Sequence, residues 1–118
     1  MPFTTGSFVE VSARATREGR LLLLDFTASW CAPCKRMEAT TWPDPRVAAW
    51  VAQHALALRI DVDVEKDVAA RFGVKSMPTM ILLRADLELD RRHGMTSAPD
   101  LVGWLTACSR DARGSTRC

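Results

Sequence analysis

Two cysteines, Cys31 and Cys34, are separated only by Ala32 and Pro33. This spacing lets the two sulfur atoms meet, so the pair can close to a disulfide and reopen. A thiolate rather than a thiol attacks a disulfide, and a helix N-terminus favours a negative charge. Pro33 predicts a helix start here, because the missing N–H of proline would have no partner in the first turn. We therefore interpret Cys31 as the nucleophile and Cys34 as the resolving thiol of a disulfide-exchange site.

Half of a zinc site is the main alternative for this pair. A structural zinc ion needs four ligands, usually from two such pairs. The other candidate ligands in the chain are His54, His93, Cys108 and Cys118. None of these has paired ligand spacing, so the sequence favours a site without metal. A second alternative, two inert core cysteines, is disfavoured by the strand predicted before the pair and the helix predicted after it.

The elements that position the cysteines follow from apolar runs and from breaks. A buried strand is predicted over residues 21–26, and its end leaves Cys31 at the protein surface. A helix is predicted from Pro33. It is interrupted at residues 42–45, where Asp44 is a good N-cap for a second helix.

The remaining segments complete an alternating pattern. Strands are predicted over residues 56–62, 80–83 and 87–91, helices over residues 45–54, 65–72 and from Ser97 onward, and either a short helix or an extended lead-in over residues 8–17. Strands that alternate with helices predict an α/β fold, in which helices cover a sheet with a parallel part. The last two strands add an antiparallel edge. The expected core residues include Trp42, Trp50, Trp104, Leu101, Leu105 and Cys108.

The composition fits one small globular domain. The chain has 118 residues, of which 47% are hydrophobic and 25% charged. We expect a single domain over residues 1–118, with a polar, frayed tail over about residues 110–118 that carries Cys118 as a mobile thiol. The formal net charge of +2 is too small to indicate nucleic acid or an anionic membrane as a partner. No apolar run approaches the ~20 residues that a membrane-spanning helix needs.

Two stretches resemble the thioredoxin family. The first, DFTASWCAPCK, covers residues 25–35, and the second, GVKSMPT, covers residues 73–79; Gly94 after the edge strand is a third, weaker match. Ala32 departs from the family's glycine, which leaves the reduction potential open. The resemblance covers nearly the whole chain. It implies the thioredoxin fold, a central mixed sheet of four or five strands flanked by helices.

A third stretch, CKRMEATTWPDPRV over residues 34–47, looks like the C-terminal thioredoxin-like domain of DsbD-type thiol:disulfide interchange proteins. Those transmembrane electron transporters pass electrons outward to periplasmic disulfide proteins. The resemblance covers only the thioredoxin-like domain, so the transporter role itself is not expected to carry over.

Two carboxylates are expected to support the cysteines. Asp25 ends a buried strand, and burial raises the pKa of a carboxyl that has no partner. The thioredoxin resemblance implies that Asp25 lies beneath Cys34 and moves its proton, through water. Glu38 takes the acidic position of the DsbD-type domain, four residues after Cys34 on the same helical face, where its charge disfavours a nearby thiolate. The alternatives are a strand-terminating turn residue for Asp25 and a solvated helix face for Glu38.

The thioredoxin resemblance also implies a substrate-binding rim. A cis bond before Pro78 would turn the backbone N–H and C=O of Met77 toward the cysteines, to pair with an extended segment of a partner protein. Trp30 either shields the disulfide within the docking surface or serves only in packing. Arg59 could approach Asp25, but its default is an exposed strand residue. The predicted substrate-binding residues are Trp30, Ala32, Pro33, Met77, Pro78 and Gly94.

Together these features predict a protein-disulfide reductase. No metal or organic cofactor is expected, and the expected partners are disulfide-containing proteins and a separate electron-donating reductase. The chain is expected to be monomeric, without nucleic-acid binding or membrane insertion.

Two other functions remain open. A disulfide oxidase or isomerase uses the same chemistry, but Ala-Pro between the cysteines, with no histidine to stabilise a thiolate, favours the reductase. A redox-inactive binding module is disfavoured by the combined presence of Cys31, Cys34, Asp25 and Pro78.

The first residues contain no cationic region followed by an apolar stretch, so they do not resemble a signal peptide. A cytoplasmic location is expected if the chain is complete. A periplasmic location is expected if it is an excised domain or lacks its signal peptide.

Overall fold

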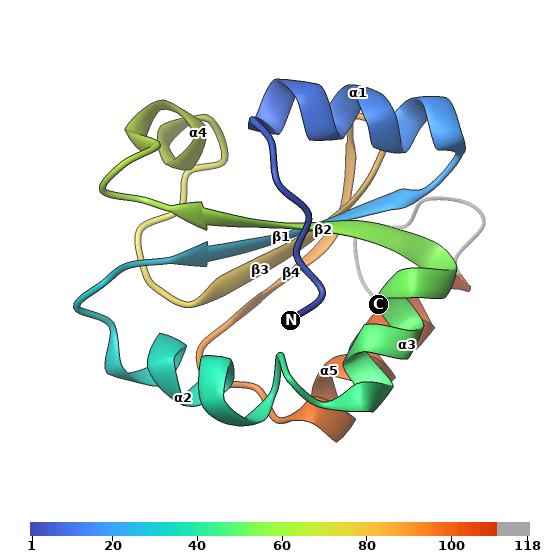
Figure 1. The fold of residues 1–118 in the computed structure, drawn as a ribbon. Coiled ribbons are helices and arrows are strands. Elements are labelled where there is room, and N and C mark those ends of the chain that lie inside the picture. Colours follow the sequence, from blue (N-terminus) through green and yellow to red (C-terminus); the bar gives the residue numbers. More distant parts are fainter. Residues whose placement is uncertain (111–118) are drawn as a thin grey trace.

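The apolar run LLLLDFT forms an inner strand of the protein. In the computed structural model, which describes residues 1–110, this run is β1 (Leu21–Thr27), and all seven of its residues are buried. A strand that is buried on both faces needs a helical layer on each side. The other elements supply these two layers (Figure 1).

Four strands form one mixed sheet in the order β2-β1-β3-β4. β2 (Ala55–Asp61) runs parallel to β1, whereas β3 (Thr79–Arg84) is antiparallel to β1 on its other side. β4 (Leu87–His93) is antiparallel to β3 and forms the far edge. The predicted α/β fold with an antiparallel edge is confirmed, and the strands begin and end within two residues of the predicted positions.

Helices cover both faces of the sheet. α1 (Phe8–Glu18) and α4 (Lys66–Arg71) lie on one face, and α2 (Ala32–Thr40), α3 (Pro45–His54) and α5 (Ala98–Ser109) lie on the other (Figure 1). The connection from β1 to β2 passes through α2 and α3, so the cysteine pair follows directly on β1. Within residues 1–110, none of the helices is both long and apolar enough to cross a membrane.

Residues 8–17, for which the sequence left a short helix or an extended lead-in open, lie in the helix α1. The Ser7 hydroxyl accepts a hydrogen bond from the backbone N–H of Glu10 at 3.1 Å, and the Glu10 carboxylate accepts one from the backbone N–H of Ser7 at 3.0 Å. Phe8, Val11 and Ala15 are buried along one face. The capping box and this apolar face, both visible in the sequence, explain the helix.

The predicted helix break at residues 42–45 is present between α2 and α3, and Asp44 is the N-cap of α3. Asp44 Oδ1 accepts a hydrogen bond from the backbone N–H of Arg46 at 2.8 Å. The Thr41 hydroxyl donates to the Thr96 carbonyl at 2.6 Å. This contact ties the interruption to the chain just before α5.

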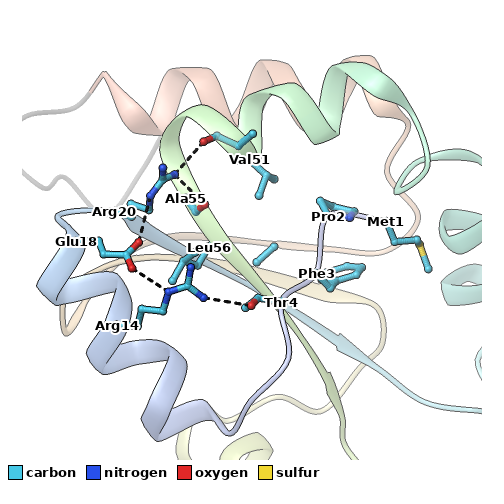
Figure 2. A pocket seen from close by; sticks show the side chains of 12 residues that line it. Met1, Pro2, Phe3, Thr4, Arg14, Glu18, Arg20, Val51, Ala55 and Leu56 are labelled. Carbon is cyan, nitrogen blue, oxygen red and sulfur yellow. Dashed lines mark hydrogen bonds and ion pairs between the residues drawn. The ribbon is translucent and has the colours of Figure 1, made fainter.

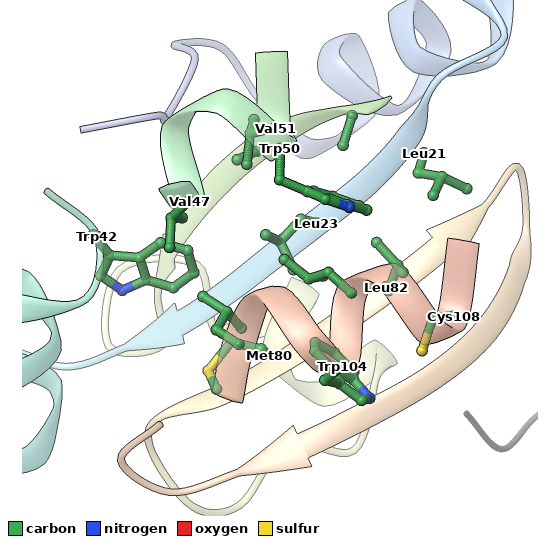
Figure 3. Close-up of a cluster of buried hydrophobic side chains, with 14 of the residues drawn as sticks. Leu21, Leu23, Trp42, Val47, Trp50, Val51, Met80, Leu82, Trp104 and Cys108 are labelled. Carbon is green, nitrogen blue, oxygen red and sulfur yellow. The ribbon is translucent and has the colours of Figure 1, made fainter. Parts of the chain in front are cut away.

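The main core lies between the sheet and the layer of α2, α3 and α5 (Figure 3). It contains the three predicted core tryptophans, Trp42, Trp50 and Trp104, together with apolar residues of β1 and β3. Cys108 on α5 is fully buried in this cluster, as predicted. The predicted frayed tail beyond residue 110, with Cys118 as a mobile thiol, lies outside the described residues.

The N-terminal segment, residues 1–5, lies along the outer edge of β2 (Figure 2). Phe3 forms a parallel bridge with Ala57, and the backbone N–H of Thr4 donates to the Ala57 carbonyl at 2.8 Å. Arg14 of α1 donates to the Thr4 hydroxyl at 3.5 Å. The segment therefore covers backbone groups of a sheet edge that would otherwise be open.

Leu82→Ala should lower the free energy of unfolding by about 2–5 kcal/mol, because the fully buried Leu82 side chain leaves a cavity in the core when it is truncated. Leu87→Ala is the matched control: Leu87 on β4 is 44% exposed, and its truncation should change that free energy by less than about 0.5 kcal/mol. Urea denaturation followed by tryptophan fluorescence measures both. Equal effects of the two substitutions would contradict this core.

Candidate active site

Cys31 and Cys34 form a disulfide at the N-terminus of α2. Cys31 is the N-cap of the helix, and its Sγ accepts a hydrogen bond from the backbone N–H of Cys34 at 3.2 Å. The two Cα atoms are 5.3 Å apart. The pair thus closes within one helical turn, and reduction leaves two thiols side by side.

The helix end stabilises a negative charge on Cys31 once the disulfide is reduced. The first N–H groups of α2 have no acceptor within the helix, and together with the helix dipole they favour an anion at this position. One of them, the N–H of Cys34, already points at Cys31 Sγ. A thiolate is the attacking species in disulfide exchange, so the electrostatics favour Cys31 as the nucleophile.

Cys31 is less exposed than the sequence predicts. The expectation that it lies at the surface is wrong for the disulfide form, in which Cys31 and Cys34 are each 3% exposed. They pack with Ala28 and against the half-buried Val62 and Met77. These three contacts come from the separate connections that follow β1, β2 and α4, so no local pattern reveals them. A partner therefore has to reach the sulfur atoms past these side chains.

Trp30, directly before the disulfide, is 66% exposed and is not a core residue. Its indole N–H donates to the Asp63 carboxylate at 2.9 Å, which fastens the ring to the connection after β2. Ala32 is exposed and Pro33 is half-buried. Sequence reasoning does not single out Asp63. A sequence argument for this contact exists, because Trp30 follows β1 and Asp63 follows β2, and the carboxyl ends of these parallel strands meet at one sheet edge.

The connection before β3 brings Met77 and Pro78 to the cysteine pair. The peptide bond between them is cis, and Met77 packs against the cysteine cluster. The backbone N–H of Gly94 donates to the Pro78 carbonyl at 2.8 Å. The φ of Gly94 is +87°, a conformation that favours glycine. Of the residues predicted to bind a partner segment, Met77 therefore contacts the cysteine cluster directly, and Gly94 is joined to it through Pro78.

Asp25 is buried in β1, with only 2% of its surface exposed. Burial raises the pKa of this carboxyl from its ordinary value of 3.8 to about 7; the Arg59 guanidinium opposes the rise, and the charge of Glu38 adds to it. Within residues 1–110, Asp25 Oδ1 has no hydrogen-bond partner. A carboxyl with a pKa near neutrality can take up or release a proton at physiological pH.

Of the two expectations for Arg59, the default of an exposed strand residue is wrong and the approach to Asp25 is confirmed. Its side chain is 30% exposed, and its Nε lies 3.8 Å from Asp25 Oδ2. The parallel register places Arg59 directly opposite Asp25 on the neighbouring strand. Glu38 on α2 is half-buried and its charge acts on Asp25, so it does not belong to a fully solvated helix face. Charged groups from two other elements thus act on the Asp25 carboxyl.

Within residues 1–110, the candidate zinc ligands His54 and His93 lie in separate places. His54 ends α3 with its ring centroid 4.9 Å from that of Trp50. His93 ends β4 with its Nδ1 3.0 Å from the Thr79 hydroxyl. Among residues 1–110, no three or more His, Cys, Asp or Glu side chains are grouped so that they could hold a metal ion.

An inner strand that leads directly into a disulfide at a helix N-terminus defines a class of small α/β redox proteins. The sequence model of the Thioredoxin family matches residues 4–107, and the chain therefore belongs to the thioredoxin family.

Curated relatives include thioredoxins of a fly and a plant. The chain is 40% identical over 72 residues to Thioredoxin-1 of Drosophila melanogaster, a match that covers 61% of this chain and 64% of the fly protein. It is 38% identical over 81 residues to Thioredoxin H4 of Arabidopsis thaliana, covering 69% of this chain and 66% of the plant protein. The chain thus spans slightly less than two thirds of the length of each of these relatives.

Solved structures share the fold. A thioredoxin from Thermus thermophilus has a TM-score of 0.83 at 22% identity, covering 96% of this chain and 92% of that chain. A structure described as DsbH oxidoreductase has a TM-score of 0.80 at 16% identity, covering 92% and 85%. At these identities the likeness concerns the fold alone, which is the thioredoxin fold that the sequence predicts.

Asp25→Asn should change how stability depends on pH in the oxidised protein, in which Cys31 and Cys34 do not titrate. The pKa of Asp25 is about 7 in the folded state against an ordinary value of 3.8. The folded state therefore binds more protons than the unfolded state between these two values, and the parent loses stability as the pH rises through this range. The asparagine variant lacks this loss.

From about pH 4 to about pH 8, the free energy of unfolding of Asp25→Asn should rise relative to the parent by on the order of 2–4 kcal/mol. Urea denaturation at both pH values measures this difference. Asp86→Asn, at an exposed turn, is the control and should follow the parent. Parallel profiles for the parent and Asp25→Asn would show that Asp25 carries no raised pKa.

Proposed function

We propose that this protein is a thiol–disulfide oxidoreductase that reduces disulfides in other proteins. The observation that carries the proposal is the Cys31–Cys34 disulfide at the N-terminus of α2, in a chain of the thioredoxin family. The redox group is this disulfide alone, and the reaction needs no metal or organic cofactor.

The reaction proceeds in two exchange steps. The Cys31 thiolate attacks one sulfur of the target disulfide, which forms a mixed disulfide and releases the other target sulfur as a thiolate. The Cys34 sulfur then attacks Cys31 Sγ, which closes the Cys31–Cys34 disulfide and releases the second target thiol. Two electrons pass to the target, whose disulfide becomes two thiols. A separate reductase returns two electrons to the Cys31–Cys34 disulfide.

Asp25 is proposed to manage the proton of Cys34. The ionised carboxylate takes the proton as Cys34 attacks, and the carboxylic acid returns it when the disulfide is reduced again. A pKa of about 7 suits this role, because both protonation states are populated at neutral pH. Water is proposed to carry the proton, and the unpartnered Asp25 Oδ1 is available to accept a hydrogen bond from it.

The partner is proposed to bind as an extended segment beside the disulfide. The backbone N–H and C=O of Met77 pair with it as in strand addition. The exposed Trp30 ring and the exposed Ala32 provide contact surface, with Pro33 and Gly94 beside them. The partners are disulfide-containing proteins and the reductase, and the protein acts as a monomer.

The DsbD-type resemblance is proposed to extend to the role of Glu38. This half-buried carboxylate contributes to the raised pKa of Asp25. Its charge also disfavours a thiolate nearby, which restrains the reduced pair until a partner binds. Proteins of that type pass electrons to several disulfide proteins, and a restrained dithiol suits such a relay.

The reduction potential of the Cys31–Cys34 couple should lie closer to that of reducing disulfide proteins, about −270 mV, than to that of oxidising ones, about −120 mV, because no histidine between the cysteines stabilises the thiolate form. Equilibration with dithiothreitol buffers, followed by thiol alkylation, measures it. A value at the oxidising end would favour the disulfide oxidase or isomerase instead.

The dithiothreitol-primed protein should reduce insulin disulfides, and Cys31→Ser should fall to the dithiothreitol background because it has lost the attacking sulfur. Cys34→Ser retains the first step, so it should accumulate covalent adducts with a disulfide-containing partner that vanish on reduction. Insulin turbidity and non-reducing electrophoresis measure the two effects. Only non-covalent complexes, with the parent and Cys31→Ser both at the dithiothreitol background, would support a binding module in place of an enzyme.

A further inference from the structure

We propose that Phe3 is a positioning residue for the proton-transfer step, because it holds the Arg59 guanidinium beside Asp25. The N-terminal segment is then part of the proton-transfer machinery and does more than cover a sheet edge. This inference rests on the proposed function, in which Asp25 exchanges a proton with Cys34.

The contact between Arg59 and Asp25 is not held by a tight hydrogen bond. The Arg59 Nε is 3.8 Å from Asp25 Oδ2, which is an ion-pair distance but too long for a hydrogen bond. Within residues 1–110, this buried Nε has no hydrogen-bond partner. The position of the guanidinium must therefore depend on its other contacts.

Those other contacts come from the N-terminal segment. The Arg59 Cζ lies over the Phe3 ring, 4.4 Å from the ring centroid, at a distance typical of a cation–π interaction. The Arg59 Nη2 donates to the Met1 Sδ at 3.6 Å. Of the two contacts, the one with the Phe3 ring is the stronger, because a thioether sulfur is a weak acceptor.

Phe3 is itself held from two sides. Its ring lies 4.8 Å, centroid to centroid, from that of the core residue Trp42. Its backbone forms the bridge with Ala57, and Thr4 donates to the same Ala57 carbonyl at 2.8 Å. Phe3 therefore has a defined place at the edge of β2 (Figure 2). Its bridge partner Ala57 lies two residues before Arg59 along that strand.

Two charged groups from different elements act on the Asp25 carboxyl. Arg59 on β2 stabilises its ionised form, and Glu38 on α2 destabilises that form, in addition to burial. If Arg59 moves away, Asp25 becomes protonated over a wider pH range. Less carboxylate is then available at neutral pH to accept the proton of Cys34.

The test is a titration of the Asp25 carboxyl carbon by NMR in the oxidised protein, with Phe3→Leu as the central variant. Leucine keeps apolar cover but removes the ring face, so the Asp25 midpoint should rise by about 0.5 pH unit. Arg59→Met should raise it by about 1 unit, because it removes the charge and keeps the stem. The pH profile of insulin reduction should move upward with Phe3→Leu by the same amount as the carboxyl midpoint.

Phe8→Leu is the matched control. The Phe8 ring also contacts a guanidinium, with Arg71 Cζ 5.1 Å from its centroid, but it belongs to the core cluster on the opposite face of the sheet from Trp42. Phe8→Leu should therefore leave the titration midpoint of Asp25 unchanged, although it removes a comparable aromatic ring.

The decisive comparison is Phe3→Leu in the Arg59→Met background, where it should produce no further shift. The same shift in both backgrounds would show that Phe3 acts on Asp25 independently of Arg59, and no shift in the parent background would show that it does not position Arg59. Either result overturns the inference. A parent that fails to reduce insulin would reject the proposed function. The carboxyl titration needs no turnover, so it would still decide whether Phe3 positions Arg59 beside Asp25.

Discussion

All seven residues of β1 are buried, and both faces of the strand are covered by helices. This constraint places α2 immediately after the strand, with Cys31 as its N-cap. It also places Asp25 where its charge is shielded from bulk water. Burial therefore gives this carboxyl a pKa near neutrality, and the first N–H groups of the helix that follows the strand favour a thiolate.

The charge state of Asp25 depends on a balance between elements that are far apart in the chain. Burial favours the acid, Arg59 on β2 favours the carboxylate, and Glu38 on α2 favours the acid again. The Arg59 guanidinium in turn lies against the Phe3 ring at the edge of the sheet. In the proposed mechanism, a proton exchanged at the cysteine pair is thus coupled to packing at the N-terminal segment through the Arg59 side chain, which contacts both Asp25 and Phe3.

Local signals account for most of the elements and for the type of site. The N-cap Asp44 and the apolar run of β1 are readable in the chain, and each forms the predicted structure. The Ser7 capping box decides for a helix in the segment where the sequence left a helix or an extended lead-in open. The exposure of Cys31 is not readable in the same way, because Val62 and Met77 reach the disulfide from other connections. The hydrogen bond from Trp30 to Asp63 likewise joins residues that no periodicity relates.

The sequence by itself determined that a cysteine pair begins a helix after a buried strand, because strand burial, proline at a helix start and cysteine spacing are properties of neighbouring residues. Only the tertiary structure decided the surroundings of Asp25. The parallel register that sets Arg59 against Asp25, and the bridge that brings Phe3 to Arg59, pair residues that are tens of positions apart. Such pairs arise from the packing of whole strands, and this packing depends on the fold as a whole rather than on any local pattern.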